Sequence, residues 1–320
     1  MKALFLHHPY VRPRFEQDFV KRLAELPEFD TARADLDALA AGRLASPDTH
    51  ASLGEYDAVL VFVAFNALRR AAPIEWGGYR GLRVLFDHDV IQNYSDIFDP
   101  TLRGAWPDVF RRHRFDSMVS SGRAVQARLA EDGIAADWVA KGFDPSRFAD
   151  LDGPRAGITS YGSAYLCRIV AERAIADAGL PLQRLGTTPY PELGAALARF
   201  LACMAVSSDL CVALDQRPFL DLAQARSKPM KPGLEPMAKI CESAAAGCCP
   251  IVDAMEDLCA LGFAHGETAI TFGSHDELVE QLRWWFERPE QVRQLGRAAS
   301  RLAQARHTWA HRAACLRDAL

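Results

Sequence analysis

"YDAVLVFVAF", residues 56–65, and "GLRVLFDHD", residues 81–89, are two apolar runs rich in β-branched and aromatic residues. Continuous runs of this kind are typical of strands that a parallel sheet buries on both faces. They follow "KALFLHH" (2–8), another short apolar run, and residues 13–29, whose apolar side chains recur at helical spacing. This alternation of strand and helix predicts a doubly wound α/β domain.

The alternation continues through "FDSMVSSG" (115–122), an amphipathic helix that Gly133 caps, and "ADWVAKGFD" (136–144). The stretch 144–157 is rich in Asp, Gly and Pro, and strand and helix patterns resume after it. The sequence therefore predicts two domains, an N-terminal acceptor-side domain over 1–150 and a C-terminal domain over 151–320. We expect both to be Rossmann-like and to face a cleft, with helices at the C-terminus.

Charge and composition restrict the partners and the compartment. The chain has 320 residues, a net charge of −4 and a pI near 6.2, and no basic stripe interleaved with aromatic residues, so we expect no nucleic-acid partner. No uninterrupted apolar run is long enough for a secretory signal or a membrane span, which predicts a cytoplasmic protein. All eight cysteines lie at Cys167 or later, without disulfide or metal-ligand spacing. We expect no metal site, no cofactor, and leave a homodimer open.

"KPGLEPMAKICESAAAGCCPIV", residues 231–252, concentrates lysine in a chain that has only six. Its pattern predicts a turn at Gly233 and Leu234, a helix from about Leu234 to Ala246 and a strand after it. A helix N-terminus behind a glycine turn suits an anion such as a diphosphate, and Lys231 and Lys239 add positive charge.

Glu235 and Glu242 are seven residues apart, which places them within ~20° of one helix face and ~10 Å apart along the axis. Carboxylates accept hydrogen bonds from vicinal ribose hydroxyls. The other interpretation is an ordinary solvent-exposed helix face, on which Lys239 and Glu242 form a surface ion pair.

"ESAAAGCCPIV" (242–252) resembles the "E-x-x-A-x-G-x-P-V" signature of group 1 glycosyltransferases, the GT-B enzymes of the family 4 type. Residues 263–313, with a His-Gly, an aromatic strand, "DELV", a Pro break and "HTW..R", are similar to the C-terminal region of its spore-maturation-protein-like branch. "GFDPSRF" (142–148) resembles the segment that closes the N-terminal domain. The resemblance covers most of residues 140–315 and implies the GT-B fold.

The resemblance also implies roles for residues of the C-terminal domain. Glu242 matches the glutamate that binds the nucleotide ribose, whereas Glu235 stands one place off the family's first glutamate. Lys239 faces the diphosphate or the sugar. Gly162, Ser163 and Arg168 resemble the first loop of the donor domain, where backbone N–H groups and a cation meet the phosphates. For Arg168 a solvated position on its helix is an equal alternative.

In the N-terminal domain, His88 resembles the strand-terminal histidine that faces the donor sugar. Asp87 and Asp89 flank it on the acceptor side, and they also imitate the D-x-D metal motif of the other large glycosyltransferase fold. A simpler alternative is that these polar residues cap the turn after a buried strand.

Three further residues, His7, His8 and Arg12, follow the first strand, at the end where α/β sheets bind ligands, and are candidates for the acceptor side.

The activity that follows from the resemblance is transfer of a sugar from a nucleotide-diphospho sugar, of the UDP type, to an acceptor that the sequence does not identify. Transfer would proceed with retention and without a metal, with His88, Lys239 and Arg168 as catalytic candidates. Two alternatives use the same fold: a nucleotide-sugar epimerase or hydrolase, and a nucleotide-sugar-binding relative without catalysis. A nicotinamide dehydrogenase is disfavoured, because no G-x-G-x-x-G follows the first strand.

Overall fold

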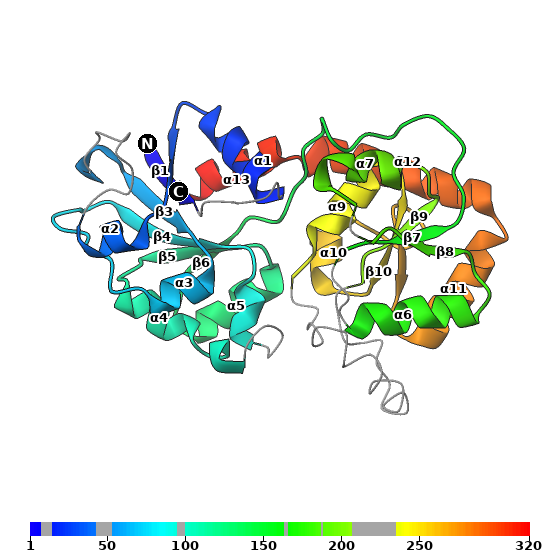
Figure 1. The fold of residues 1–320 in the computed structure, drawn as a ribbon, viewed down its shortest axis with the longest axis horizontal. Coiled ribbons are helices and arrows are strands. Elements are labelled where there is room, and N and C mark those ends of the chain that lie inside the picture. Colours follow the sequence, from blue (N-terminus) through cyan, green and yellow to red (C-terminus); the bar gives the residue numbers. More distant parts are fainter. Residues whose placement is uncertain (8–14, 43–52, 95–99, 163–165, 187, 207–234) are drawn as a thin grey trace. The chain divides into compact units, whose positions relative to one another are not determined.

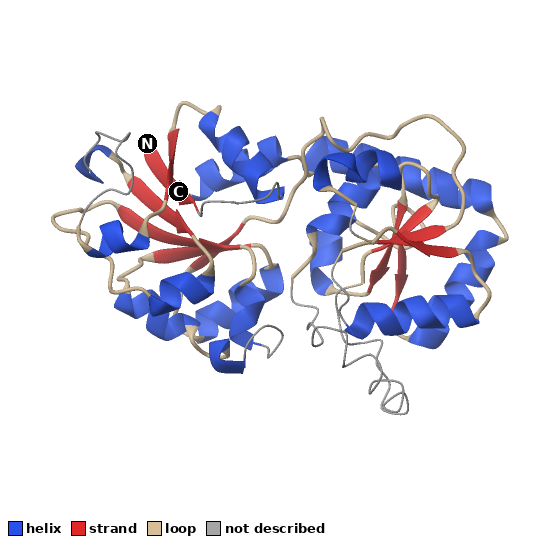
Figure 2. Ribbon diagram, in the orientation of Figure 1, coloured by secondary structure: helices blue, strands red, loops and turns tan. Residues whose placement is uncertain are grey.

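The computed structural model describes residues 1–7, 15–42, 53–94, 100–162, 166–186, 188–206 and 235–320. The chain divides into two compact units, each with its own parallel sheet (Figures 1 and 2). Unit 1 is Met1–Ala140 with Trp309–Leu320, and unit 2 is Lys141–Thr308. The predicted fold class of two α/β domains is confirmed.

The described part of unit 1 holds a six-stranded sheet in the order β2-β1-β3-β4-β5-β6, with every pair parallel. The strands are β1 (Ala3–His7), β2 (Phe29–Arg33), β3 (Ala58–Phe62), β4 (Leu82–Asp87), β5 (Ser117–Ser120) and β6 (Ala136–Trp138). All five residues of β3 are buried, as its unbroken apolar run predicts.

Helices cover both faces of this sheet, with α1 and α13 on one side and α3, α4 and α5 on the other (Figure 1). They are α1 (Phe15–Ala24), α2 (Leu36–Ala40), α3 (Phe65–Arg70), α4 (Trp106–Arg112), α5 (Arg123–Glu131) and α13 (Trp309–Ala319). The described residues of unit 1 also form the 3-10 turns η1 (Leu53–Glu55), η2 (Val90–Tyr94) and η3 (Pro100–Leu102).

Unit 2 holds, among its described residues, a five-stranded parallel sheet in the order β11-β10-β9-β7-β8. The strands are β7 (Ile158–Ser160), β8 (Leu182–Arg184), β9 (Ala202–Met204), β10 (Cys249–Asp253) and β11 (Ile270–Phe272). The helices are α6 (Leu166–Asp177), α7 (Leu193–Leu197), α9 (Ala238–Ala245), α10 (Glu256–Ala260), α11 (His275–Phe286) and α12 (Pro289–Arg306), with the 3-10 turn η4 (Tyr190–Glu192). Helix α6 packs beside α11, and α9 packs beside α12.

The predicted division at residue 150 differs from this one in two places. The first unit ends at Ala140, and the last helix, α13, belongs to it rather than to the C-terminal unit. The reason is an apolar stripe at helical spacing, Trp309, Ala313 and Leu316, which is fully buried in the core of unit 1. The Trp309 ring lies 5.0 Å from that of Phe19 on α1, centroid to centroid.

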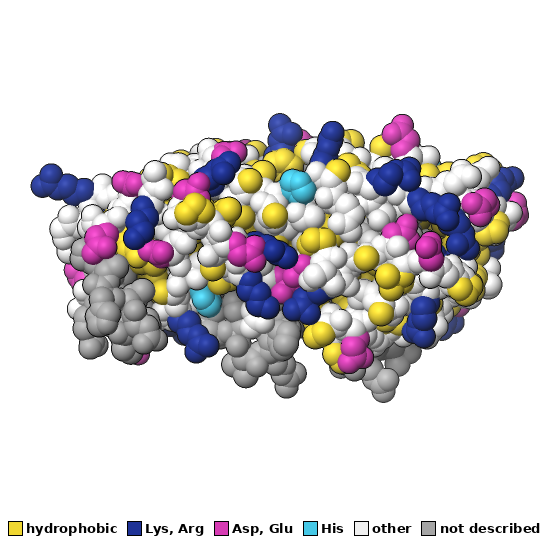
Figure 3. All heavy atoms as spheres, turned by 90° about the horizontal axis from the view of Figure 1, so that it is seen from above, with side chains coloured by type: hydrophobic (Ala, Val, Ile, Leu, Met, Phe, Trp, Pro, Cys, Tyr) yellow, Lys and Arg dark blue, Asp and Glu magenta, His cyan; other side chains and the backbone are white. Residues whose placement is uncertain are grey.

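Two further properties concern membrane-spanning helices and the distribution of surface charge. No helix among the described residues has the length and the apolar character needed to cross a bilayer. On the face shown in Figure 3, basic and acidic side chains are interspersed.

Candidate donor site

The carboxyl ends of the strands of unit 2 carry the polar residues of the candidate site. Strand β7 ends at Ser160, Tyr161 and Gly162 follow it, and α6 begins at Leu166. Because neighbouring strands are parallel, the carboxyl ends of β8 and β9 lie on the same side of the sheet as the carboxyl end of β7. Open α/β sheets bind their ligands at this edge.

Gly162 lies directly against two cations. Its φ is +80°, a left-handed conformation that favours glycine. A Cβ atom at this position would lie 2.6 Å from Lys239 Nζ and 3.9 Å from Arg168 Nη1. The turn therefore requires glycine for conformation as well as for space, and it leaves room for positive groups beside the backbone.

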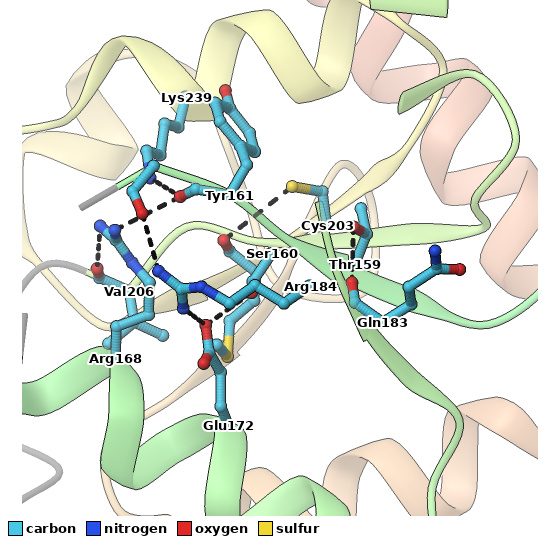
Figure 4. Close-up of polar contacts among 12 residues, drawn as sticks. Thr159, Ser160, Tyr161, Arg168, Glu172, Gln183, Arg184, Cys203, Val206 and Lys239 are labelled. Carbon is cyan, nitrogen blue, oxygen red and sulfur yellow. Dashed lines mark hydrogen bonds and ion pairs between the residues drawn. The ribbon is translucent and has the colours of Figure 1, made fainter. Parts of the chain in front are cut away.

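Among the described residues, Lys239, Arg168 and Arg184 converge on the carbonyl groups of Tyr161 and Gly162 (Figure 4). Lys239 Nζ donates to the Tyr161 carbonyl oxygen, and Arg168 Nη1 donates to the same oxygen at 3.3 Å. Arg184 Nη2 donates to the Gly162 carbonyl oxygen at 2.7 Å. Like charges this close repel one another, so an anion that enters between them is strongly attracted.

Arg168 is fully buried, which decides between its two predicted positions. Its guanidinium points inward, with Nη2 3.5 Å from the Val206 carbonyl oxygen beyond the end of β9. The alternative of a solvated helix residue is wrong, because α6 turns this side chain toward the sheet edge.

The pKa of Lys239 lies well below its ordinary value. Burial is the main cause, and the nearby Arg168 charge is the second; Cys203 and Glu242 act in the opposite direction. The Lys239 ammonium also lies 4.4 Å from the centre of the Tyr161 ring. Because burial makes the charged form of Lys239 unfavourable, an anion that binds beside it stabilises that form strongly.

Glu242 is held by a tyrosine from another part of unit 2. The Tyr161 hydroxyl donates to Glu242 Oε2 at 2.6 Å, and the Glu242 residue is 3% exposed. Burial first, and then the Glu242 charge, raise the pKa of Tyr161 well above 10, so the phenol stays protonated and donates. Lys239 and Glu242 are three residues apart on α9 and lie on the same side of that helix.

Glu235 differs from the sequence prediction in its position. The helix begins at Ala238 rather than near Leu234, because Pro236 disfavours helical backbone at the residue before it and Met237 is extended (φ −81°, ψ 148°). Glu235 is therefore outside the helix. It is fully buried, and its Oε2 lies 4.0 Å from Lys141 Nζ.

The predicted catalytic histidine of unit 1 lies in an aromatic cluster. His88 is 3% exposed, and its ring centre lies 4.8 Å from that of Phe86 and 5.4 Å from that of Phe62. Trp309 stacks on it at 6.0 Å. A catalytic role for His88 remains a prediction.

The other described residues of the predicted acceptor side lie at strand ends. His7 is the last residue of β1, and its carbonyl accepts a hydrogen bond from Ala34 N at 2.8 Å. Asp87 ends β4, and its Oδ1 accepts from the backbone N–H of Asp89 at 2.7 Å, which is the turn-capping arrangement.

Six predicted site residues lie outside the described residues: His8, Arg12, Ser163, Lys231, Gly233 and Leu234. Within the described part of the chain, no three His, Cys, Asp or Glu side chains gather as metal ligands.

The sequence prediction missed Tyr161 and Arg184, and also Ser160 and Glu172, whose side chains are hydrogen-bonded to each other beside this turn. Ser160 and Tyr161 directly precede the predicted residues Gly162 and Ser163, and their place at the end of a strand is the only signal that the sequence offers for them. Arg184 also ends a strand. No sequence pattern points to Glu172 as a site residue, because a single carboxylate on a helix is common and the residues that it contacts are distant in the sequence.

Comparisons with known proteins show the family and the fold of the chain. The model of the family described as "Glycosyl transferase-like" matches residues 156–318. The sucrose-phosphate synthase structure from Thermosynechococcus elongatus has 12% identity and a TM-score of 0.61, covering 100% of this chain and 98% of that one. The Anabaena HepE structure with UDP-glucose has 14% identity and a TM-score of 0.61, covering 100% of both chains. No curated protein matches the sequence.

The family match spans more than half of the chain and includes every cation and carboxylate of the candidate site in unit 2. The structural similarity extends over both units. The resemblance to the spore-maturation-protein-like branch stays a prediction. The chain is a member of the glycosyl transferase-like family, with the GT-B fold.

Proposed function

We propose that the chain transfers a hexosyl group from a nucleotide-diphospho sugar, of the UDP type, to an acceptor. One observation carries this proposal: Lys239, Arg168 and Arg184 converge on the turn at Gly162. A diphosphate carries the negative charge that suits three cations, and the edge of a parallel sheet is the usual position for it. That the HepE structure contains UDP-glucose supports the choice of donor.

Glu242 supplies the second part of the donor site. A carboxylate held in place by Tyr161 has acceptor oxygens suited to the ribose hydroxyls of the nucleotide. The restricted carboxylate loses little further freedom when a ligand binds. Phosphate and ribose contacts thus come from adjacent turns of one helix, α9.

The cations also suit the transfer step. As the glycosidic bond breaks, negative charge develops on the β-phosphate of the leaving nucleotide. Positive groups that are already fixed there stabilise this charge without reorganising, which is commonly the largest catalytic contribution. Because side chains supply these charges, we propose transfer without a metal. Retention of configuration at the sugar is proposed from the resemblance to the family 4 type alone.

A nucleotide-binding screen followed by a turnover assay tests the function. UDP and UDP-sugars at 100 times their Kd are expected to stabilise the protein by about 2.7 kcal/mol in thermal unfolding. Activity should depend on an added acceptor and be unchanged by a chelator. Absence of any nucleotide effect contradicts the proposal. Product from donor alone indicates an epimerase or hydrolase, and restoration by Mn²⁺ after chelation implicates Asp87 and Asp89.

The pH dependence of UDP binding is a further prediction. The charged form of Lys239 attracts the diphosphate; it is present below its pKa in the folded protein and is lost as the pH rises through that pKa. Since this pKa is lowered, UDP affinity is expected to fall at a pH well below the ordinary lysine value of 10.5. Titration calorimetry at a series of pH values below 10.5 measures the midpoint of this fall in affinity.

Lys239→Arg is the control for this pH prediction, because a guanidinium stays charged throughout the range. Its alkaline decline should move to higher pH. An identical decline in both proteins would assign it to another group. Stability has its own dependence: between the folded and unfolded pKa values the unfolded chain binds more protons at Lys239, so this residue makes stability rise with pH there.

A further inference from the structure

We propose that Arg184 and Glu172 are positioning residues of the donor site, which hold the Gly162 turn in its binding conformation. This inference rests on the proposed function. Arg184 stands at the end of the edge strand β8, and Glu172 stands on α6. Neither belongs to the segments that predict the donor site from the sequence, and Figure 4 shows the Glu172 carboxylate directed at the Arg184 guanidinium.

The contacts form one continuous chain of hydrogen bonds. Ser160 Oγ donates to Glu172 Oε1 at 2.5 Å, and Arg184 Nη1 pairs with the same carboxylate oxygen. Arg184 Nη2 then donates to the Gly162 carbonyl oxygen at 2.7 Å. These hydrogen bonds connect the turn with the end of β7, the helix α6 and the end of β8.

The planar guanidinium explains why arginine stands here. Its N–H groups are fixed relative to one another, so one group held by a carboxylate directs another at a carbonyl. A lysine ammonium carries the same charge without this geometry. The side chains of Glu172 and Arg184 are 15% and 31% exposed, so the pair is partly shielded from solvent.

The turn needs such a support because Gly162 has few conformational restraints of its own. Glycine adopts positive and negative φ with similar ease. Lys239 and Arg168 lie against this residue, so a turn that moves changes the place where these cations meet the diphosphate. Arg184 fixes the Gly162 carbonyl, and with it the backbone beside the two cations.

Glu172→Gln separates positioning from simple charge. Removing a negative group near an anion site strengthens anion binding by electrostatics alone. Positioning requires the opposite result, because an amide holds the Arg184 guanidinium less firmly than a carboxylate does. We expect Arg184→Gln to weaken UDP binding by about 10-fold, as for one lost charge-assisted hydrogen bond, and Glu172→Gln, which keeps a neutral hydrogen bond, by about 3-fold.

The experiment measures the Kd of UDP and of uridine by calorimetry for wild type, Arg184→Gln, Arg184→Lys and Glu172→Gln. Uridine lacks the diphosphate, so its Kd should not change. Arg184→Lys is expected to lie between wild type and Arg184→Gln. Arg173→Gln is the matched control, since it removes an exposed ion pair with Asp177 (2.8 Å) on the same helix, α6.

Several results overturn the inference. Positioning is excluded if Glu172→Gln binds UDP as tightly as wild type or more tightly. It is also excluded if the variants lose as much affinity for uridine as for UDP, or if Arg173→Gln loses as much UDP affinity as they do. Should Glu172→Gln fail to fold, Ser160→Ala removes one contact of Glu172 and is expected to weaken UDP binding in the same direction. A wild-type protein that binds no nucleoside diphosphate overturns the proposed function itself, whereas wild-type binding with unaffected variants overturns only this inference.

Discussion

Replacing Lys239 by methionine is expected to lower kcat for sugar transfer by about 100- to 1000-fold, the range found when one preorganised group that stabilises developing charge is removed. Methionine keeps most of the length and the apolar stem but carries no charge. The ammonium contacts the Tyr161 carbonyl and lies beside Gly162, where we propose that the leaving diphosphate binds. The effect on kcat should exceed the effect on donor KM, because the charge on the phosphate grows as the bond breaks.

Steady-state kinetics with a saturating acceptor measure this difference. Lys21→Met on α1 is a suitable control, since the Lys21 side chain is 66% exposed and belongs to unit 1. A Lys239→Met enzyme with kcat within threefold of wild type would show that this lysine does not stabilise the leaving group. Thermal unfolding of both variants checks that the fold is kept.

Replacing Glu242 by alanine is expected to raise the donor KM and the Kd of UDP by about 100-fold, which corresponds to losing two charge-assisted hydrogen bonds at about 1.5 kcal/mol each. Glu242→Gln should cost less, because an amide oxygen still accepts from the Tyr161 hydroxyl and from one ribose hydroxyl. Alanine also leaves that buried hydroxyl without its acceptor, which costs about 1–3 kcal/mol of stability.

A cycle with 2′-deoxy-UDP makes the assignment of Glu242 specific. When the carboxylate binds the ribose hydroxyls, the loss from Glu242→Gln and the loss from the deoxy ligand are not additive. Additive losses would place Glu242 away from the ribose. Glu280→Gln on α11, an exposed carboxylate of the same unit, is expected to leave both ligands unaffected.

Local patterns predicted the parts of the site that lie within a single segment. Gly162 and Arg168 were predicted from the resemblance of their segment to the first loop of the family's donor domain. Glu242 and Lys239 were predicted because they share a helix that ends before Gly247, and because this segment resembles the family signature. The error at Glu235 has a local cause too, since Pro236 shifts the helix start to Ala238.

The sequence by itself determined the class of fold. Strand and helix periods are properties of short segments, and the buried runs of β3 and β4 allow a parallel sheet with helices on both faces. It also indicated the family, because the motif around Glu242 is contiguous. No long-range contact is needed for either inference.

Only the tertiary structure decided which residues complete the site. Tyr161 meets Glu242 across 81 positions, Arg184 meets the Gly162 turn across 22, and Glu235 is buried against Lys141. The last helix packs on unit 1, although it follows unit 2 in the chain. Such pairings depend on the order of the strands and on which face of each helix packs against the sheet. A local sequence pattern specifies neither of these, because the free energy that favours one arrangement is summed over contacts throughout the packed core.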